Sequence, residues 1–140
     1  MKKAILTVTL LAFAALCAAR AQAQIVVIAN TSVSADAVSK AELRDVYNGV
    51  STSLKSGARV RPVILKDCPT HNQFLMDYLG KNSVTFLIAW RGLVLSGQAT
   101  MPKSVDSEPA MVDYISKTAG TIGYVSKATP HDSVKELSVH

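Results

Sequence analysis

The sequence predicts an α/β fold in which one sheet is flanked by helices. Apolar, β-branched runs that suit buried strands alternate along the chain with segments whose apolar residues recur at helical spacing. Polar caps and glycine stops divide these segments into short elements. The length of 140 residues allows one domain with a modest core and makes two full domains unexpected.

The first 23 residues have the layout of a secretory signal peptide. Lys2 and Lys3 precede an apolar run, and Ala21-Gln22-Ala23 forms a small-x-small cleavage site. The apolar run is shorter than the roughly 20 residues that span a bilayer, which argues against the alternative of a retained anchor. We therefore expect a signal peptide at 1–23, a single periplasmic domain at 24–140, and no membrane insertion after the signal is removed.

The basic charge of the chain belongs largely to this segment. The whole sequence has 15 basic and 10 acidic residues and a net charge of +5, but Lys2, Lys3 and Arg20 lie before the cleavage site. The 12 basic and 10 acidic residues that follow leave +2 and are scattered singly, so we expect no nucleic-acid partner. Cys17 also lies in the signal, which leaves Cys68 with no intrachain disulfide partner.

The first elements of the domain are a strand and a helix. Residues 24–30 form a β-branched run that ends in polar residues, which is typical of a buried strand. Ser39 and Glu42 have the spacing of a capping box, in which each side chain serves the other residue's backbone N–H. The helix that they begin is expected to stop at Asn48-Gly49.

A second strand and a second helix follow. Residues 59–65 predict the strand, and Pro62 predicts that part of it lies at an edge or a bulge. After the turn at 66–69 a helix is expected to run to Gly80. Its apolar positions are expected to be Phe74, Met76, Tyr78 and Leu79.

The next helix is predicted at 83–95, and it is apolar on most sides. It is too short to cross a membrane, so we expect it to be the central buried helix. Residues 96–105 are expected to form a loop.

The last elements are a helix and two strands. Ser107 is expected to cap a helix that ends at Gly120 and faces the core with Met111, Val112 and Ile115. Residues 122–125 predict a short strand and residues 134–139 a half-exposed final strand. The expected order is strand, helix, strand, three helices, and two strands.

A candidate binding site lies between the end of the second strand and the start of the following helix. Ligands bind at such places in open α/β sheets because the loops diverge and the helix N-terminus presents unpaired N–H groups. Lys66, Thr70 and protonated His71 would suit a small oxyanion. Asp67 would repel an anion, and the alternative is that Asp67 or Thr70 only caps the helix. The candidate ligand-binding residues are Lys66, Asp67, Cys68, Thr70, His71 and Asn72.

The sequence gives little indication of a catalytic site, a metal site or a nucleotide-binding loop. Cys68 and His71 could form a nucleophile and base, but no orienting acid or oxyanion hole is identified, so we expect no enzyme. His71, His131 and His140 are too widely spaced to indicate a metal site. The segment Gly120–Gly123 enters a strand, which does not fit a nucleotide loop, and no cofactor is expected.

Several segments in this order resemble the phosphate-type periplasmic binding proteins, the type 2 solute-binding proteins of the phosphate ABC transporter. Residues 39–49 resemble that family's helix end of leucine, aromatic and glycine, and Trp90 resembles the tryptophan of a later helix. Residues 59–74 are similar to its strand, Ser-Gly-Thr and phenylalanine helix, and 119–125 to its Gly-x-Ile-Gly-Tyr-Val ending. The resemblance covers nearly the whole chain after residue 23.

The resemblance implies a non-catalytic protein that binds phosphate or a related oxyanion and is linked to ABC-type uptake. Family members close two lobes around phosphate, whereas this chain has the length of one lobe. The Ser-Gly-Thr triplet reads Cys68-Pro69-Thr70 here. The alternative function is therefore a periplasmic interaction module, a lobe that no longer binds ligand and docks onto an envelope or transporter protein.

Overall fold

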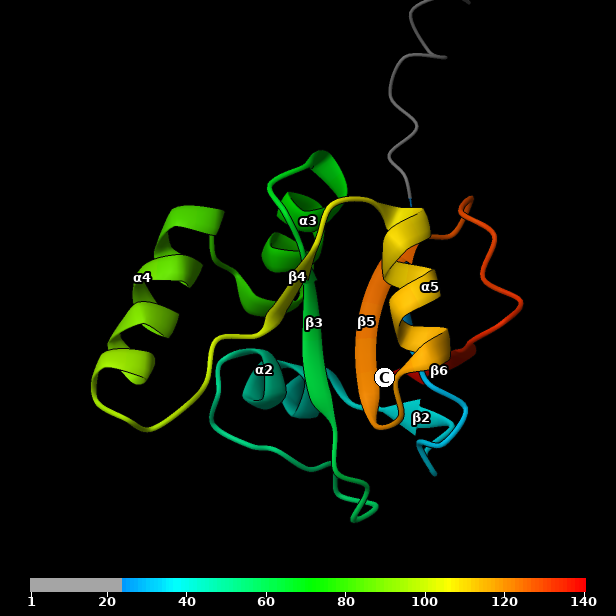
Figure 1. The fold of residues 1–140 in the computed structure, drawn as a ribbon, viewed down its shortest axis with the longest axis horizontal. Coiled ribbons are helices and arrows are strands. Elements are labelled where there is room, and N and C mark those ends of the chain that lie inside the picture. The colour runs from blue at the N-terminus through cyan, green and yellow to red at the C-terminus, as the bar shows by residue number, and fades with distance from the viewer. Residues whose placement is uncertain (1–23) are drawn as a thin grey trace, which may run out of the picture.

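The computed structural model describes residues 24–140, and the expected signal peptide at 1–23 lies outside the described residues (Figure 1). The elements in chain order are β1 (Ile25–Ala29), β2 (Ala37–Val38), α2 (Lys40–Tyr47), β3 (Arg61–Leu65), α3 (Pro69–Phe74), the π-helix η2 (Leu75–Leu79), α4 (Ser83–Leu95), β4 (Lys103–Val105), α5 (Glu108–Lys117), β5 (Thr121–Ser126) and β6 (Lys135–Val139).

The six strands form one mixed sheet in the order β2-β6-β1-β5-β3-β4. Strand β3 runs parallel to both β4 and β5, whereas β1 runs antiparallel to β5 and β6. Helices flank this sheet, so the predicted α/β class is confirmed.

The helices cover the two faces of the sheet in separate layers. Successive residues of a strand point to opposite faces, and Gly123 and Tyr124 of β5 therefore mark the two sides. A Cβ at Gly123 would lie 2.4 Å from Ile115 Cδ1 of α5, so α5 packs directly on that face. The ring of Tyr124 stacks on Phe74 of α3, with ring centroids 3.8 Å apart, and meets Tyr47 of α2 edge-on. The core thus lies on both sides of β5 and β1.

The local signals read from the sequence are confirmed at the helix ends. Glu42 N–H donates to Ser39 Oγ at 3.1 Å and Ser39 N–H to Glu42 Oε2 at 2.7 Å, which completes the capping box. Ser107 Oγ caps α5 by accepting from Ala110 N–H at 3.2 Å. Gly80 ends η2 in the left-handed conformation with φ of 65°, which glycine adopts without strain.

Two short strands were not predicted. Strand β4 lies inside the expected loop 96–105, and β2 follows β1. Strand β3 as a whole lies inside the sheet because β4 adds at its outer side, but the part that holds Pro62 pairs with β5 alone, as predicted for an edge. Pro62 is tolerated there because its pairing with β5 ends at this residue and pairing with β4 begins only at Val63.

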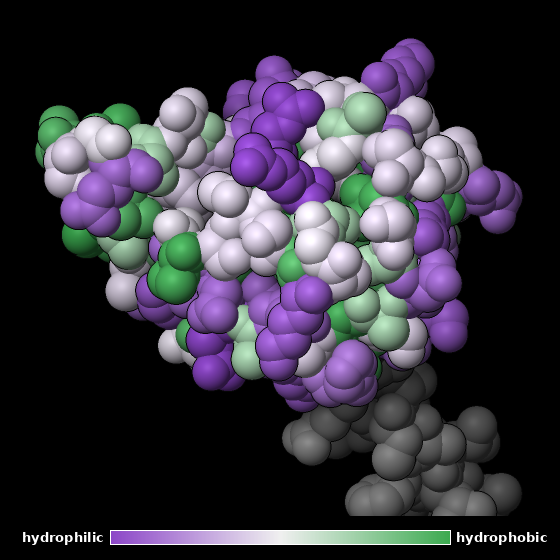
Figure 2. Space-filling view, turned by 90° about the horizontal axis from the view of Figure 1, so that it is seen from below, coloured by the Kyte–Doolittle hydropathy of each residue, from purple (hydrophilic) through white to green (hydrophobic). Residues whose placement is uncertain are grey.

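The prediction that α4 is the central buried helix was wrong. Only Phe86 and Trp90 of this helix are buried, and α4 stands at the left of the sheet in Figure 1. Four apolar side chains of this helix point to solvent, with exposed fractions of 64% for Val84, 62% for Ile88, 41% for Val94 and 88% for Leu95. Hydrophobic side chains are visible at the left of Figure 2, the side of the molecule on which α4 lies. The two faces of the sheet are already covered by α5 and by α2 with α3, so no central position is left.

The apolar positions predicted for 69–80 were correct except for Met76, which is 57% exposed. Leu75 is buried in its place. Met76 lies two positions after the buried Phe74, roughly 200° around a helix, and therefore points away from the core. The helix continues from α3 as a π-helix at Leu75–Leu79.

Two buried tyrosines fill the opening where β3 and β5 diverge. The pairing of these strands extends only to Pro62 and Ile122. Beyond it, the Tyr47 hydroxyl lies 3.2 Å from the carbonyl oxygens of both Val63 and Ile122, and the Tyr124 hydroxyl accepts from Leu65 N–H at 3.0 Å. The hydroxyls thus take the hydrogen bonds that a continuous strand ladder would have made.

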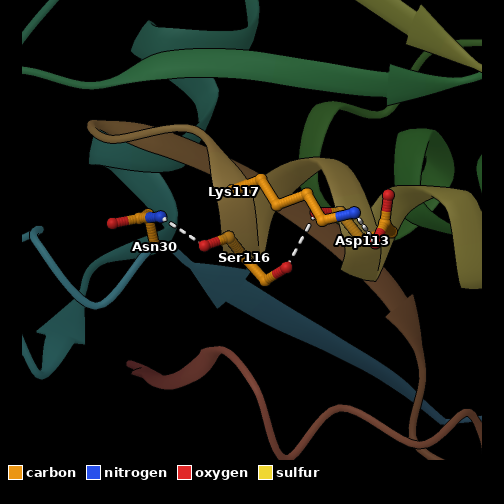
Figure 3. A network of polar contacts seen from close by, with 4 residues as sticks. All are labelled: Asn30, Asp113, Ser116 and Lys117. Atoms are coloured by element: carbon orange, nitrogen blue, oxygen red, sulfur yellow. Dashed lines mark hydrogen bonds and ion pairs between the residues drawn. The ribbon is translucent and has the colours of Figure 1, made fainter.

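A buried asparagine fixes the end of α5. Asn30 follows β1, and its Nδ2 donates to the carbonyls of Ile115 at 2.6 Å and Ser116 at 3.2 Å. Both carbonyls belong to the last turn of α5, and that of Ile115 also accepts from Thr118 N–H at 3.4 Å. Figure 3 shows the contact with Ser116 together with the exposed ion pair between Lys117 and Asp113. The contact between β1 and α5 sets the position of the helix on the sheet.

The close contact at Gly123 predicts the outcome of a matched pair of substitutions. Gly123→Ala places a methyl 2.4 Å from Ile115 and 2.6 Å from Met111, and we expect a loss of about 1–3 kcal/mol of unfolding free energy from overpacking. Gly92→Ala in α4 has no atom within 4 Å of its new methyl and should add about 0.5–1 kcal/mol, because alanine favours helix. Urea unfolding of both variants measures this, and equal effects would contradict the packing of α5 on β5.

Candidate functional site

Three parallel strands end at the same edge of the sheet, shown at the top of Figure 1. Strands β3, β4 and β5 are followed there by residues 66–70, 106–108 and 127–129. The first turns of α3 and α5 lie at this edge as well. This is the edge at which ligands bind in open α/β sheets. We call it the carboxyl edge.

The hydrogen-bond donors of the carboxyl edge converge on one carboxylate, that of Glu108 at the start of α5. Its Oε1 accepts from Ser126 N–H at 2.5 Å and from the Thr129 hydroxyl at 3.1 Å. Its Oε2 accepts from the Thr70 hydroxyl at 3.2 Å. The donors come from β5, from the loop after it and from α3, so the contact joins three segments that are distant in sequence.

The environment of Glu108 favours its charged form. Partial burial raises the pKa of Glu108, but the hydrogen bonds from Ser126, Thr129 and Thr70 together outweigh it and hold this pKa below its usual value. The carboxylate also lies at the N-terminus of α5, where the helix dipole favours negative charge. The carboxyl edge therefore holds the side chain of Glu108 as an anion.

Lys66 contributes a positive charge to the carboxyl edge. Its ammonium lies 2.5 Å from Asp106 Oδ1, and both side chains are exposed. The hydrogen bond and the charge of Lys66 lower the pKa of Asp106. An exposed pair of this kind adds little to stability and leaves Lys66 free to change partner.

The remaining predicted residues are not all brought together. Cys68 is the N-cap residue of α3 and a half-buried free thiol, as expected from the sequence. The side chain of Asp67 is exposed, and so is that of Asn72. His71 is 4% exposed and points into the core.

His71 is held by Tyr124 beneath α3. Its Nδ1 lies against the Tyr124 hydroxyl, whose oxygen already accepts from Leu65 N–H. We assign the tyrosine O–H as donor and neutral His71 as acceptor, because the hydroxyl has a single proton to give. Burial lowers the pKa of His71, and the charge of Asp67 opposes this only in part. Burial also raises the pKa of Tyr124, so both partners are neutral at pH 7.

Three residues of the carboxyl edge were missed in the sequence: Glu108, Ser126 and Thr129. Ser107 was recognised as a helix cap, but β4 was not recognised as a strand. Its parallel pairing with β3 is what brings the start of α5 to the carboxyl edge. The triplet Lys103–Val105 is too short for its alternation to stand out in the sequence.

Within the described residues, no three His, Cys, Asp or Glu side chains lie close enough together to hold a metal ion. Over the same range, from residue 24 onward, no helix has the length and apolar character needed to cross a membrane.

No family model matches this sequence, and no curated protein matches it significantly. Solved structures match its fold. A protein from Clostridium perfringens assigned as a phosphate ABC transporter substrate-binding protein, with bound phosphate, is 17% identical with a TM-score of 0.63. An ABC-type phosphate transport receptor from Vibrio cholerae and PstS from Borrelia burgdorferi are each 16% identical with TM-scores of 0.56.

These matches cover 84% of this chain but only 45%, 46% and 47% of the three proteins, in the same order. The chain thus spans a little under half the length of the structures that it matches. The resemblance predicted from the sequence is confirmed for the fold, which is that of one lobe of such a binding protein.

The pKa values of His71 and His131 are expected to be shifted in opposite directions. The pKa of His71 lies below the usual 6.5 because of burial, and that of His131 lies above it because the Thr129 carbonyl and Glu136 accept its hydrogen bonds. Imidazole signals followed by NMR from pH 5 to 8 measure both values. The same pKa for His71 and for His131 would contradict the buried contact of His71 with Tyr124.

The lowered pKa of His71 also links stability to pH. The unfolded chain binds a proton on His71 more readily than the folded chain, so the stability contributed by neutral His71 is present above pH 6.5 and is lost as the pH falls through the folded pKa. Urea unfolding at pH 7 and 5.5 should show this loss in the wild type and a smaller one in His71→Asn, whose amide oxygen replaces Nδ1 as acceptor. Identical pH dependence in the two proteins would exclude this role.

Proposed function

We propose that this chain is a non-catalytic binding protein whose ligand is phosphate or a related oxyanion, and that it acts in the periplasm in connection with ABC-type uptake. The fold supports the proposal, because the structures that share it are described as phosphate-binding or phosphate-transport proteins. Those descriptions belong to proteins of which this chain covers 45% and 46%, and the ligand and the transporter partner are carried over to this chain as part of the proposal.

The observation that carries the proposal is the convergence of donors on Glu108. Two hydroxyls, from Thr70 and Thr129, and the Ser126 N–H hold the two oxygens of one carboxylate. Hydrogen bonds to a charged oxygen are short and strong, and the same donors suit the oxygens of phosphate or sulfate. Thr70 is also the threonine retained from the family's Ser-Gly-Thr triplet.

In this proposal the oxyanion takes the place of the Glu108 carboxylate. Glu108 is the first residue of α5, so its side chain can turn to solvent without a change in the helix. Lys66 lies at the same edge and can leave exposed Asp106 to pair with the incoming anion. Replacing the Glu108 carboxylate by an oxyanion releases less binding free energy than filling an empty site would. A single lobe also offers only half of a binding cleft. We therefore expect weak binding that a partner on the open side would strengthen.

The alternative function is an interaction module that binds an envelope or transporter protein and no solute. Two observations favour it: Pro69 removes one N–H from the start of α3, and Glu108 already satisfies the donors. The alternatives differ in one respect, because only the binding protein gains affinity for an oxyanion when Glu108 is removed.

Glu108→Ala is expected to bind phosphate at least about tenfold more tightly than the wild type, because the competing charge is gone. Thr70→Val removes one donor and is expected to weaken binding about threefold to tenfold. Asp113→Asn is the matched control, since it removes a carboxylate from the exposed side of the same helix. Isothermal titration of residues 24–140 with phosphate and with sulfate measures these affinities.

The absence of heat above dilution with both anions at millimolar concentration, in the wild type and in Glu108→Ala, would overturn oxyanion binding and leave the interaction module. Equal gains in Glu108→Ala and Asp113→Asn would show a general effect of net charge and would overturn the placement of the site at the carboxyl edge.

Export to the periplasm is tested by expressing residues 1–140, which include the expected signal peptide. We expect the protein recovered from a periplasmic fraction of Gram-negative cells to begin at Gln24, because Ala21-Gln22-Ala23 provides the small-x-small cleavage site. N-terminal sequencing or intact mass measures this. A product that retains Met1 and stays with the membrane would instead indicate an uncleaved anchor.

A further inference from the structure

A second concave site lies at the opposite end of the sheet from Glu108. A pocket of about 770 Å³ opens where β3, β4 and β5 begin, between the end of α2 and the segment 98–103. Because these three strands are parallel, they all begin at the end of the sheet that lies opposite the carboxyl edge. The pocket volume lies within the range of roughly 300–1,000 Å³ typical of small-molecule sites.

The floor of this pocket is apolar and fixed. Val46 of α2, Val63 of β3 and Trp90 of α4 line it, and all three are buried by the rest of the protein. The indole N–H of Trp90 donates to the Tyr47 carbonyl at 2.9 Å, which holds the ring in place. The glycine at position 49, with φ of 74°, leaves room for this ring, since a Cβ there would lie 3.2 Å from Trp90 Cη2.

The rim of the pocket is basic. Arg59, Arg61 and Lys103 line it, and its lining includes no aspartate or glutamate. Within residues 24–140, none of these three side chains forms an ion pair with a carboxylate. Hydrophilic side chains gather at this end of the molecule in Figure 2, which views it from the side where β3 begins.

The existing contacts of the rim leave most of its donors free. Arg61 uses one N–H for the Ala119 carbonyl at 3.1 Å, and a guanidinium has five. Lys103 places its ammonium 5.6 Å from the centre of the Tyr114 ring, which also lines the pocket. An anion that enters at the rim therefore meets three positive charges without having to displace a carboxylate.

We propose that this pocket binds a small organic anion, a compound with a carboxylate or phosphate group on an apolar, preferably ring-shaped body. The apolar floor formed by Trp90 accepts the body, and Arg59, Arg61 and Lys103 hold the anionic group, to which guanidinium can bind in a bidentate manner. The site is separate from the carboxyl edge and does not depend on oxyanion binding there.

The protein carries a built-in reporter for this site, because Trp90 is its only tryptophan and lies in the pocket floor. The probe is 4-tert-butylbenzoate, which combines a ring, an apolar group and a carboxylate. Its neutral counterpart is 4-tert-butylbenzyl alcohol, and inorganic phosphate supplies charge without an apolar body. Each is titrated into residues 24–140 while the fluorescence of Trp90 is followed with excitation at a wavelength that tryptophan alone absorbs.

We expect 4-tert-butylbenzoate to change the fluorescence with saturation in the millimolar range or below, and the neutral alcohol to bind at least tenfold more weakly. The double variant Arg59→Gln, Arg61→Gln should lose at least tenfold in affinity, because both side chains are exposed and their removal leaves the floor intact. Arg91→Gln is the matched control, since Arg91 is exposed on the same helix as Trp90 but does not line the pocket. Its affinity should stay within twofold of the wild type.

Three results would overturn the proposal. The first is unchanged Trp90 fluorescence at 10 mM 4-tert-butylbenzoate. The second is equal affinity for the neutral alcohol, which would mean that the basic rim takes no part. The third is equal loss of affinity in the double variant and in Arg91→Gln, which would mean that net charge rather than the rim attracts the anion.

Discussion

The divergence of β3 from β5, bridged by two buried tyrosine hydroxyls, is the constraint on which the rest of the structure depends. The hydroxyls of Tyr47 and Tyr124 serve the backbone groups of Val63, Ile122 and Leu65 where strand pairing has stopped. A buried backbone group without a partner costs about 1–3 kcal/mol. Loss of either hydroxyl would therefore leave the separated strands with unpaired backbone groups, which disfavours their separation. The opening lets β3 lead into α3 while β5 continues beside β1.

The carboxyl edge follows from this arrangement. Stacking of Tyr124 on Phe74 fixes α3, and with it the hydroxyl of Thr70. On the other face, Asn30 holds the last turn of α5, and the helix brings Glu108 to the opposite end. The donors of three segments thus meet at one carboxylate. The fold places the Glu108 carboxylate at this edge, and in the proposed function a solute oxyanion takes the same position.

The parts of the fold that local chemistry determines could be predicted from the sequence. The capping box at Ser39 and the inward face of α5 were correct because neighbouring residues decide them. The position of α4 could not be predicted, since its apolar composition does not reveal that other helices already cover both faces of the sheet. Glu108 was missed for a related reason: its role depends on the parallel pairing of β4 with β3, a contact between residues about 40 positions apart. His71 fits a ligand-binding pattern in sequence but lies in the core, because the first turn of α3 faces Tyr124.

We propose that the donors engaged by Glu108 form an oxyanion site. Backbone amide NMR of residues 24–140 during a phosphate titration tests this proposal most directly, because the Ser126 N–H is itself one of the donors. We expect the amide signals of Ser126, Thr70 and Glu108 to shift most and to follow one saturation curve. Shifts that are absent at millimolar phosphate, or that gather around Arg59 and Arg61 at the other end of the sheet, would contradict it.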